Sequence, residues 1–141
     1  MPRGRSGPAR HNPGMTNLHK GQTGLGRLVR ATGYSLDGLR TAYLTEGAFR
    51  QETWAALALL PASVWLGSGD WVRTGMLAGS VLLVLIVELL NSSLEAVVDR
   101  VSLDPHALSK RAKDLGSAAV FLSVLSCAGL WCAAAWSRFH G

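Results

Sequence analysis

The stretch Leu115–Ser137, LGSAAVFLSVLSCAGLWCAAAWS, runs for 23 residues without a single charge. An α-helix rises about 1.5 Å per residue and the hydrocarbon core of a bilayer is about 30 Å thick, so this stretch is long enough to cross a membrane. Two further apolar stretches precede it, and the sequence predicts spans over about 49–69, 74–94 and 115–137. Only 16% of the 141 residues are charged, against about 25% in soluble domains. The sequence therefore predicts an all-α membrane protein.

The positive charges follow a pattern that sets the orientation of these spans. Of the 14 Lys and Arg residues, all but two lie before or at the very start of the first predicted span, or between the second and the third. The exceptions, Arg73 and Arg138, flank the spans on the other side. The positive-inside rule then places the N-terminus in the cytoplasm and the C-terminus on the outer side. Topology explains most of the net charge of +5, so no nucleic-acid partner is expected.

The part of the chain before the spans divides into two segments. Residues 1–24 are rich in Gly, Pro and Arg without apolar periodicity, and are predicted to be a disordered basic tail. Over about 25–46 apolar residues recur at helical spacing with Arg between them, which predicts an amphipathic helix in the cytoplasmic interface; a helix facing water is the alternative. Gly33 and Gly38 are expected to weaken and interrupt it. The domain with this helix and the spans covers residues 25–141.

Three carboxylates and one amide form a stripe on the second predicted span. At about 100° per residue, Glu88, Glu95 and Asp99 fall within about 40° of one another, with Asn91 about 60° to one side. This arrangement, at the cytoplasmic end of a span, suits chemistry between a lipid hydroxyl and a water-soluble polyanion held by Mg²⁺. Three simpler interpretations remain open here: a solvated helix end, a buried acid paired with a cation, and interhelical hydrogen bonding by the amide.

No common nucleotide-binding signature accompanies this stripe. The chain has no G-x-x-x-x-G-K-[ST] loop, no H-R-D or D-F-G sequence and no Cys/His cluster of zinc spacing. The residue pattern alone therefore indicates a functional acidic face without naming a reaction.

The stripe itself carries a family resemblance. Glu88–Asp99, ELLNSSLEAVVD, resembles the signature E-x-[LIVM]-N-[ST]-[SA]-[LIV]-E-x-x-V-D of prokaryotic integral-membrane diacylglycerol kinases. Four more blocks are similar to that family in the same order: GYS at Gly33–Ser35, EGAFRQE at Glu46–Glu52, AKDLGSAAV at Ala112–Val120 and the WC…W block at Trp131–Trp136. The resemblance extends from about residue 24 to the C-terminus.

The resemblance implies a homotrimer of three-span subunits in a bacterial inner membrane, with active sites shared between subunits near the cytoplasmic face. It implies transfer of the γ-phosphate of Mg-ATP to the hydroxyl of diacylglycerol, which gives phosphatidate. Glu88 is then the general base with Asn91 beside it, and Glu46 and Glu95 hold Mg²⁺. The positions that match nucleotide contacts are Arg27, Tyr34, Glu46, Glu95, His106, Lys113 and Asp114. The positions that match lipid contacts are Arg40, Phe49, Arg50, Gln51, Glu52, Glu88, Ser117 and Trp131.

Three alternatives compete with this interpretation. Undecaprenol kinases are similar in architecture, although the blocks Gly47–Glu52 and Gly116–Ser117 look more like the diacylglycerol enzymes. A small ion-coupled transporter would use Glu88 as a proton or cation site. A membrane scaffold without catalytic activity would use the basic interfacial helix to bind anionic lipids.

Overall fold

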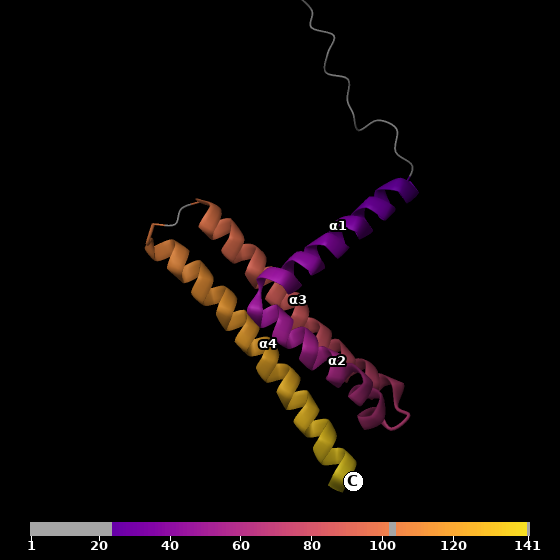
Figure 1. Cartoon of the computed structure of the whole chain (residues 1–141). Coiled ribbons are helices and arrows are strands. Elements are labelled where there is room, and N and C mark those ends of the chain that lie inside the picture. Colours follow the sequence, from indigo (N-terminus) through magenta and orange to yellow (C-terminus); the bar gives the residue numbers. More distant parts are fainter. Residues whose placement is uncertain (1–23, 102–103, 141) are drawn as a thin grey trace, which may run out of the picture. The chain divides into compact units, whose positions relative to one another are not determined.

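The computed structural model describes residues 24–101 and 104–140, and its secondary structure over these ranges is entirely α-helical (Figure 1). Most of the predicted tail, residues 1–23, lies outside the described residues. The helices are α1 (Gly24–Thr45), α2 (Gly47–Gly67), α3 (Trp71–Val101) and α4 (Ala107–His140). Residues 24–36 belong to one structural unit and residues 37–140 to another, so the first half of α1 is described separately from the rest.

Helix α1 confirms the helix predicted over 25–46, but the interruption expected at Gly33 and Gly38 is wrong. The helix runs unbroken through both glycines for 22 residues. Each glycine costs about 1 kcal/mol relative to alanine, which is too little to break the cooperative backbone hydrogen bonding of a helix this long. The side chains of Thr32 and Ser35 add hydrogen bonds to carbonyls one turn earlier.

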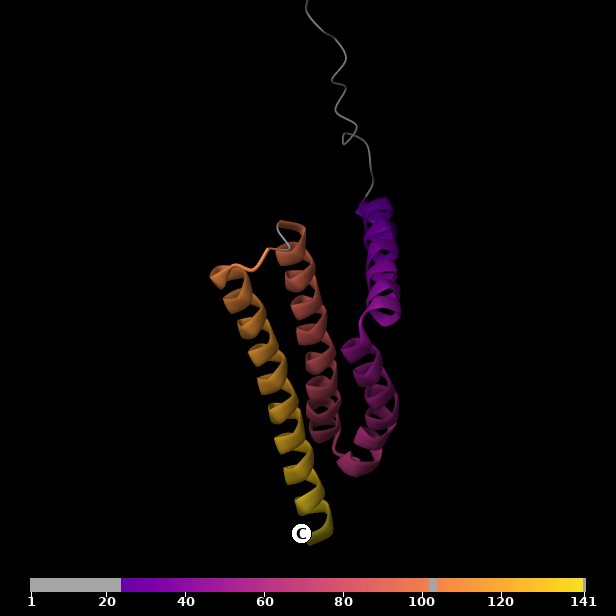
Figure 2. The same cartoon turned by 60° about the vertical axis from the view of Figure 1, so that its left-hand side comes forward.

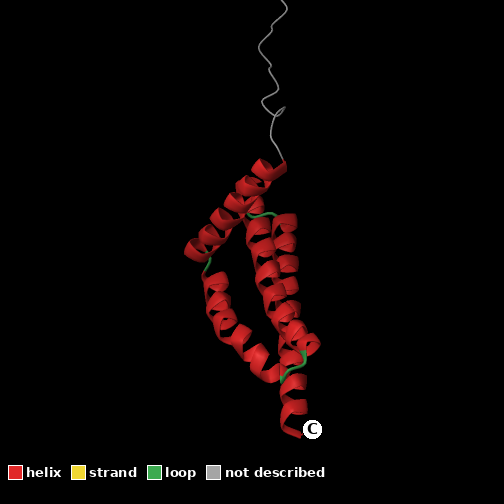
Figure 3. Ribbon diagram, turned by 90° about the vertical axis from the view of Figure 1, so that its right-hand side faces the viewer, coloured by secondary structure: helices red, strands yellow, loops and turns green. Residues whose placement is uncertain are grey.

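Glu46 separates α1 from α2. Its backbone is extended, with φ −99° and ψ 115°, and its side chain makes no capping hydrogen bond to α2. The Glu46 carboxyl group therefore does not cap the N-terminus of α2. Helix α2 curves further along its length (Figure 3) and contains Pro61. Proline removes one backbone donor and bends a helix in this way.

A tight turn joins α2 to α3. Ser68 adopts a left-handed conformation with φ 52°, and the carboxylate of Asp70 accepts hydrogen bonds from the backbone N–H groups of Val72 and Arg73 at 2.9 and 3.1 Å. This is the side-chain cap that the first turn of α3 requires. Gly67 lies so close to α3 that a Cβ atom there would sit 2.0 Å from the hydroxyl oxygen of Thr74.

Helix α3 lies alongside both α2 and α4 (Figure 2). One buried cluster joins the three helices at mid-length, and a second joins them near the turn. The first cluster contains Ala56, Val81, Val84 and Cys127. The second contains Leu66, Leu77 and Ala134. Helix α3 is thus the central element, and its acidic stripe is held in place by neighbours on two sides.

Two helices match predicted spans by length and composition. Helices α3 and α4 contain apolar windows with mean hydropathy 2.1 and 2.0, of which only 17% and 11% is buried within the chain. Both extend beyond the predicted spans because the polar segments that follow the second and precede the third are also helical. Helix α2 corresponds to the first predicted span in position, but not in hydropathy, so that span remains a prediction.

The close approach at Gly67 generates a stability prediction. Gly67→Ala should lower the free energy of unfolding by about 1–3 kcal/mol, because the new methyl group collides with Thr74. Thermal unfolding in detergent micelles measures this. Gly79→Ala is the matched control, since it lies within α3 with nothing within 4 Å of the new Cβ atom. Equal stability of the two variants would contradict the close approach.

Candidate active site

The acidic stripe of α3 passes from a buried to an exposed environment along the helix. Glu88 is 5% exposed, Asn91 and Glu95 are half-buried, and Asp99 is exposed near the end of α3. The Asn91 side-chain amide donates a hydrogen bond to the Glu95 carboxylate at 3.0 Å. The predicted stripe is therefore one continuous polar surface, with Asn91 bridging toward the outer carboxylates.

Further carboxyl groups gather around Glu88. The charges of Glu95 and Glu46 act on Glu88, and Glu88 in turn acts on Glu52. Repulsion between these negative charges is unfavourable in a partly buried environment, and a cation bound nearby would reduce it. Over residues 24–101 and 104–140, however, no three His, Cys, Asp or Glu side chains are arranged to hold a metal ion.

Asn91 is tightly enclosed on the side that faces α4. A Cβ atom on Gly116 would lie 2.2 Å from the Asn91 side-chain oxygen and 3.2 Å from a methyl carbon of Leu94. The absence of a side chain at Gly116 thus lets α4 approach α3 closely. The Asn91 oxygen is buried and has no hydrogen-bond partner among the described residues. Gly116 thus leaves room for the Asn91 side chain between α3 and α4.

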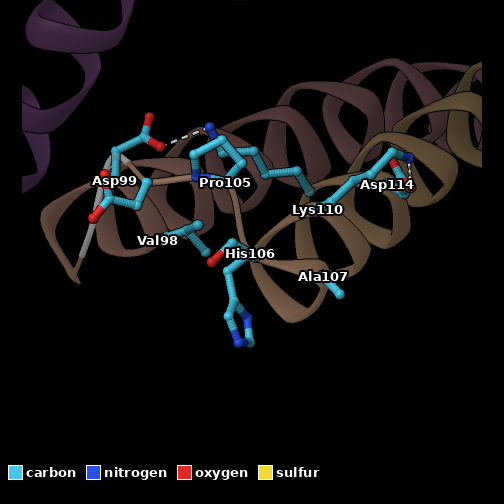
Figure 4. Close-up of a pocket in the computed structure, with 10 residues that line it drawn as sticks. Val98, Asp99, Pro105, His106, Ala107, Lys110 and Asp114 are labelled. Carbon is cyan, nitrogen blue, oxygen red and sulfur yellow. Dashed lines mark hydrogen bonds and ion pairs between the residues drawn. The ribbon is translucent and has the colours of Figure 1, made fainter.

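A pocket opens between the end of α3 and the start of α4 (Figure 4). Its volume is about 540 Å³, enough for a nucleotide-sized ligand. The lining residues are Val98, Asp99, Asp104, Pro105, His106, Ala107, Ser109, Lys110, Lys113 and Asp114. The structure therefore brings together three predicted nucleotide contacts, His106, Lys113 and Asp114.

Two ion pairs set the charge distribution of this pocket. Lys113 lies 2.6 Å from the Asp99 carboxylate, and Lys110 lies 2.5 Å from that of Asp114, both drawn as dashed lines in Figure 4. The hydrogen bond to Asp99 raises the pKa of Lys113 above its usual range, so this ammonium group stays charged at physiological pH. The His106 ring accepts a hydrogen bond from the backbone N–H of Leu108 at 3.2 Å. The Lys113 ammonium group is therefore held beside the exposed end of the acidic stripe.

A second, largely apolar pocket of about 360 Å³ lies between α2, α3 and α4. Glu52 and Trp131 both line it. Within residues 24–101 and 104–140, a buried carboxylate oxygen of Glu52 and the indole nitrogen of Trp131 have no hydrogen-bond partner. An apolar cavity with a few polar atoms is typical of a lipid or small-molecule site.

The remaining predicted residues are less closely grouped. Phe49 is buried, whereas Arg40, Gln51 and Ser117 are exposed. Arg50 is exposed and donates a hydrogen bond to the backbone oxygen of Tyr43 at 3.4 Å. Arg27 and Tyr34 belong to residues 24–36, the unit described separately, so neither is brought to the site by the structure.

Asp99 and Lys110 line the first pocket and take part in its two ion pairs, but neither is among the predicted site residues. The position of Asp99 on the stripe was a signal for it, since Asp99 shares the helix face of Glu88 and Glu95. The spacing of four between Lys110 and Asp114 was a signal for Lys110, because such pairs meet on a helix surface.

Comparisons with known proteins show the family of this chain. Residues 33–135 match the family model of the prokaryotic diacylglycerol kinases. A diacylglycerol kinase of Escherichia coli is 48% identical over 117 residues, which cover 83% of this chain and 95% of that protein. One of Pseudomonas aeruginosa is 51% identical over 79% of this chain and 90% of its own length, and one of Helicobacter pylori is 38% identical over 77% and 84%.

The two long apolar helices and the matching family together support a membrane protein. The chain belongs to the prokaryotic diacylglycerol kinase family, and it is a kinase.

The contact between Gly116 and Asn91 predicts a loss of activity. Gly116→Ala should reduce kcat roughly 10- to 100-fold, because displacement of Asn91 by an ångström misaligns the stripe. Steady-state kinase assays on purified protein measure this. Gly129→Ala, on the same helix with nothing within 4 Å, should keep the wild-type kcat. Wild-type activity in Gly116→Ala would show that Asn91 has no positional role.

Proposed function

We propose that this kinase transfers the γ-phosphate of ATP to the hydroxyl of diacylglycerol and so produces phosphatidate. The observation that carries the proposal is the continuous acidic stripe of α3, which runs from buried Glu88 to exposed Asp99. In this proposal the lipid hydroxyl meets the buried end of the stripe and the water-soluble nucleotide meets the exposed end. The names of the relatives, all diacylglycerol kinases at 38–51% identity, support the acceptor.

Glu88 is proposed as the general base. Its carboxylate accepts the proton of the lipid hydroxyl as the hydroxyl oxygen forms a bond to the γ-phosphorus, and the bond from that phosphorus to the β–γ bridging oxygen breaks to release ADP. General-base assistance of this kind contributes typically 10²–10⁴-fold to a rate. Asn91 is proposed to keep the stripe in register, which its hydrogen bond to Glu95 and its enclosure by Gly116 support.

Glu46 and Glu95 are proposed to hold Mg²⁺ together with the phosphates of ATP. The donor set fits this ion, because both are carboxylates, their charges act on the same carboxyl group, and Mg²⁺ needs only one or two carboxylates beside phosphates. Glu46 makes no capping bond to α2, and its carboxylate accepts an exposed hydrogen bond from the Thr45 hydroxyl at 3.2 Å. When bound, the ion would neutralise charge that develops on the transferring phosphoryl group.

The pocket between α3 and α4 is proposed as the nucleotide site. Lys113, Asp114 and His106 are its proposed nucleotide contacts, and the fixed charge of Lys113 would attract phosphates. Arg27 and Tyr34 of α1 are proposed as further contacts on the basis of the family resemblance alone.

The apolar pocket is proposed to receive the lipid. Glu52 and Trp131 would offer their unpaired polar atoms to the glycerol region, and the apolar lining would receive an acyl chain. Arg40, Phe49, Arg50, Gln51 and Ser117 complete the proposed lipid contacts, again on the basis of the family resemblance.

The assembly is proposed to be a homotrimer of three-span subunits in the bacterial inner membrane, with active sites shared between subunits. Helix α2 would supply the remaining span, since its 21 residues are long enough to cross. The exposed apolar surfaces of α3 and α4 would face lipid and neighbouring subunits. The charge pattern supports an N-terminus in the cytoplasm and a C-terminus in the periplasm.

Radiolabelled phosphate transfer from Mg-ATP tests this proposal, with diacylglycerol and undecaprenol offered in parallel mixed micelles. The label should appear in phosphatidate, and Glu88→Gln should lower its rate about 100-fold or more, because the amide cannot accept the proton. Asp37→Asn, an exposed change on α1 outside the proposed site, is the matched control and should retain wild-type transfer.

The other outcomes are equally informative. Label on undecaprenol alone would place this kinase with the polyprenol enzymes. Unchanged transfer in Glu88→Gln would refute the assignment of the base while leaving the acceptor intact.

A further inference from the structure

Lys110 lies in the pocket between α3 and α4 without a role in the function proposed above. It lines the pocket together with Lys113, and its ammonium group contacts the Asp114 carboxylate at 2.5 Å (Figure 4). Lys110 and Lys113 are three residues apart on α4, so their side chains project from neighbouring positions on the same side of that helix. Both lysines therefore contribute a positive charge to the same pocket.

The charge of this pocket depends on Lys110. Three lining residues are acidic, Asp99, Asp104 and Asp114, against the two lysines, so with His106 neutral the lining carries a formal charge of −1. Without Lys110 it would be −2. A polyphosphate is itself strongly negative, so each further negative charge at the lining raises the free energy of its binding.

The pair between Lys110 and Asp114 is exposed and therefore weak. The two side chains are 77% and 60% exposed, and ion pairs of this kind contribute little to stability because water and salt compete for them. An exposed lysine can leave a single carboxylate for a more highly charged partner at small cost. Lys113, 39% exposed, is held more firmly by Asp99.

We propose that Lys110 is a second phosphate-binding cation of the nucleotide site, which exchanges its ion pair with Asp114 for the polyphosphate of Mg-ATP. The exchange also releases the Asp114 carboxylate to accept hydrogen bonds from the nucleotide. This inference rests on the proposed function for the location of the nucleotide, but it concerns binding and not transfer. A surface ion pair that merely supports α4 is the competing explanation.

Equilibrium dialysis of labelled ATP with Mg²⁺ against the full-length protein in micelles tests the inference. Lys110→Gln should raise the Kd for Mg-ATP roughly three- to tenfold at an ionic strength of about 20 mM, and this difference should shrink toward none at about 0.5 M. Lys110→Arg should restore binding, because it returns the charge. A purely structural role of Lys110 would not produce this dependence on salt.

Arg111→Gln is the matched control, since Arg111 is the next residue and equally a cation but does not line the pocket. It should leave the Kd unchanged. A Lys110→Gln value equal to that of the wild type or of Arg111→Gln, or a shift that does not change with salt, would overturn the inference. Wild-type binding without phosphate transfer would refute the proposed function and leave this test valid, whereas absence of binding by the wild type would refute both.

Discussion

The burial of the Glu88 carboxyl group among apolar helices is the constraint on which the rest of the structure depends. An acid in this position is energetically expensive, so its surroundings must supply neighbours that tolerate it. Helices α2 and α4 cover α3 on two sides, and the stripe beyond Glu88 leads through Asn91 and Glu95 to the polar end of α3. A fold that only had to be stable would place leucine at this position. A carboxyl group at this position therefore supports the catalytic role proposed for Glu88.

Close helix packing positions α2 and α4 against α3. Gly116 lets the backbone of α4 come within contact of the Asn91 side chain, and Gly67 does the same for α2 and Thr74 at the other end of α3. The helices are thus fixed near both ends of the α3 span. The pocket proposed for the nucleotide lies between the end of α3 and the start of α4, where two polar helix ends meet with paired lysines and aspartates. The structure thus combines closely packed apolar helices with a polar pocket whose exposed ion pairs can exchange partners.

Much of this could be predicted from sequence, since helical periodicity and charge patterns are local. The bounds of α1 and α2 and the stripe of Glu88, Asn91, Glu95 and Asp99 follow from spacing along one helix. The pairing of Lys113 with Asp99 could not be predicted, because it depends on how the α3–α4 connection brings two helix ends together. The predicted interruption at Gly33 and Gly38 was wrong, because the low helix propensity of glycine costs little free energy compared with the cooperative hydrogen bonding of the helix. Positions such as Arg27 and Tyr34 stay predictions, since they lie in the unit described separately.

Glu88 is proposed to act in proton transfer and Glu95 in binding Mg-ATP. A comparison of Mg-ATP binding with phosphate transfer in Glu88→Gln and Glu95→Gln tests these two roles most directly. Glu88→Gln should bind Mg-ATP with the wild-type Kd and fail to transfer phosphate, because the base acts on the lipid hydroxyl. Glu95→Gln should weaken Mg-ATP binding on the order of tenfold or more, because one hard oxygen ligand is lost. Weakened binding in Glu88→Gln together with intact binding in Glu95→Gln would contradict these two roles.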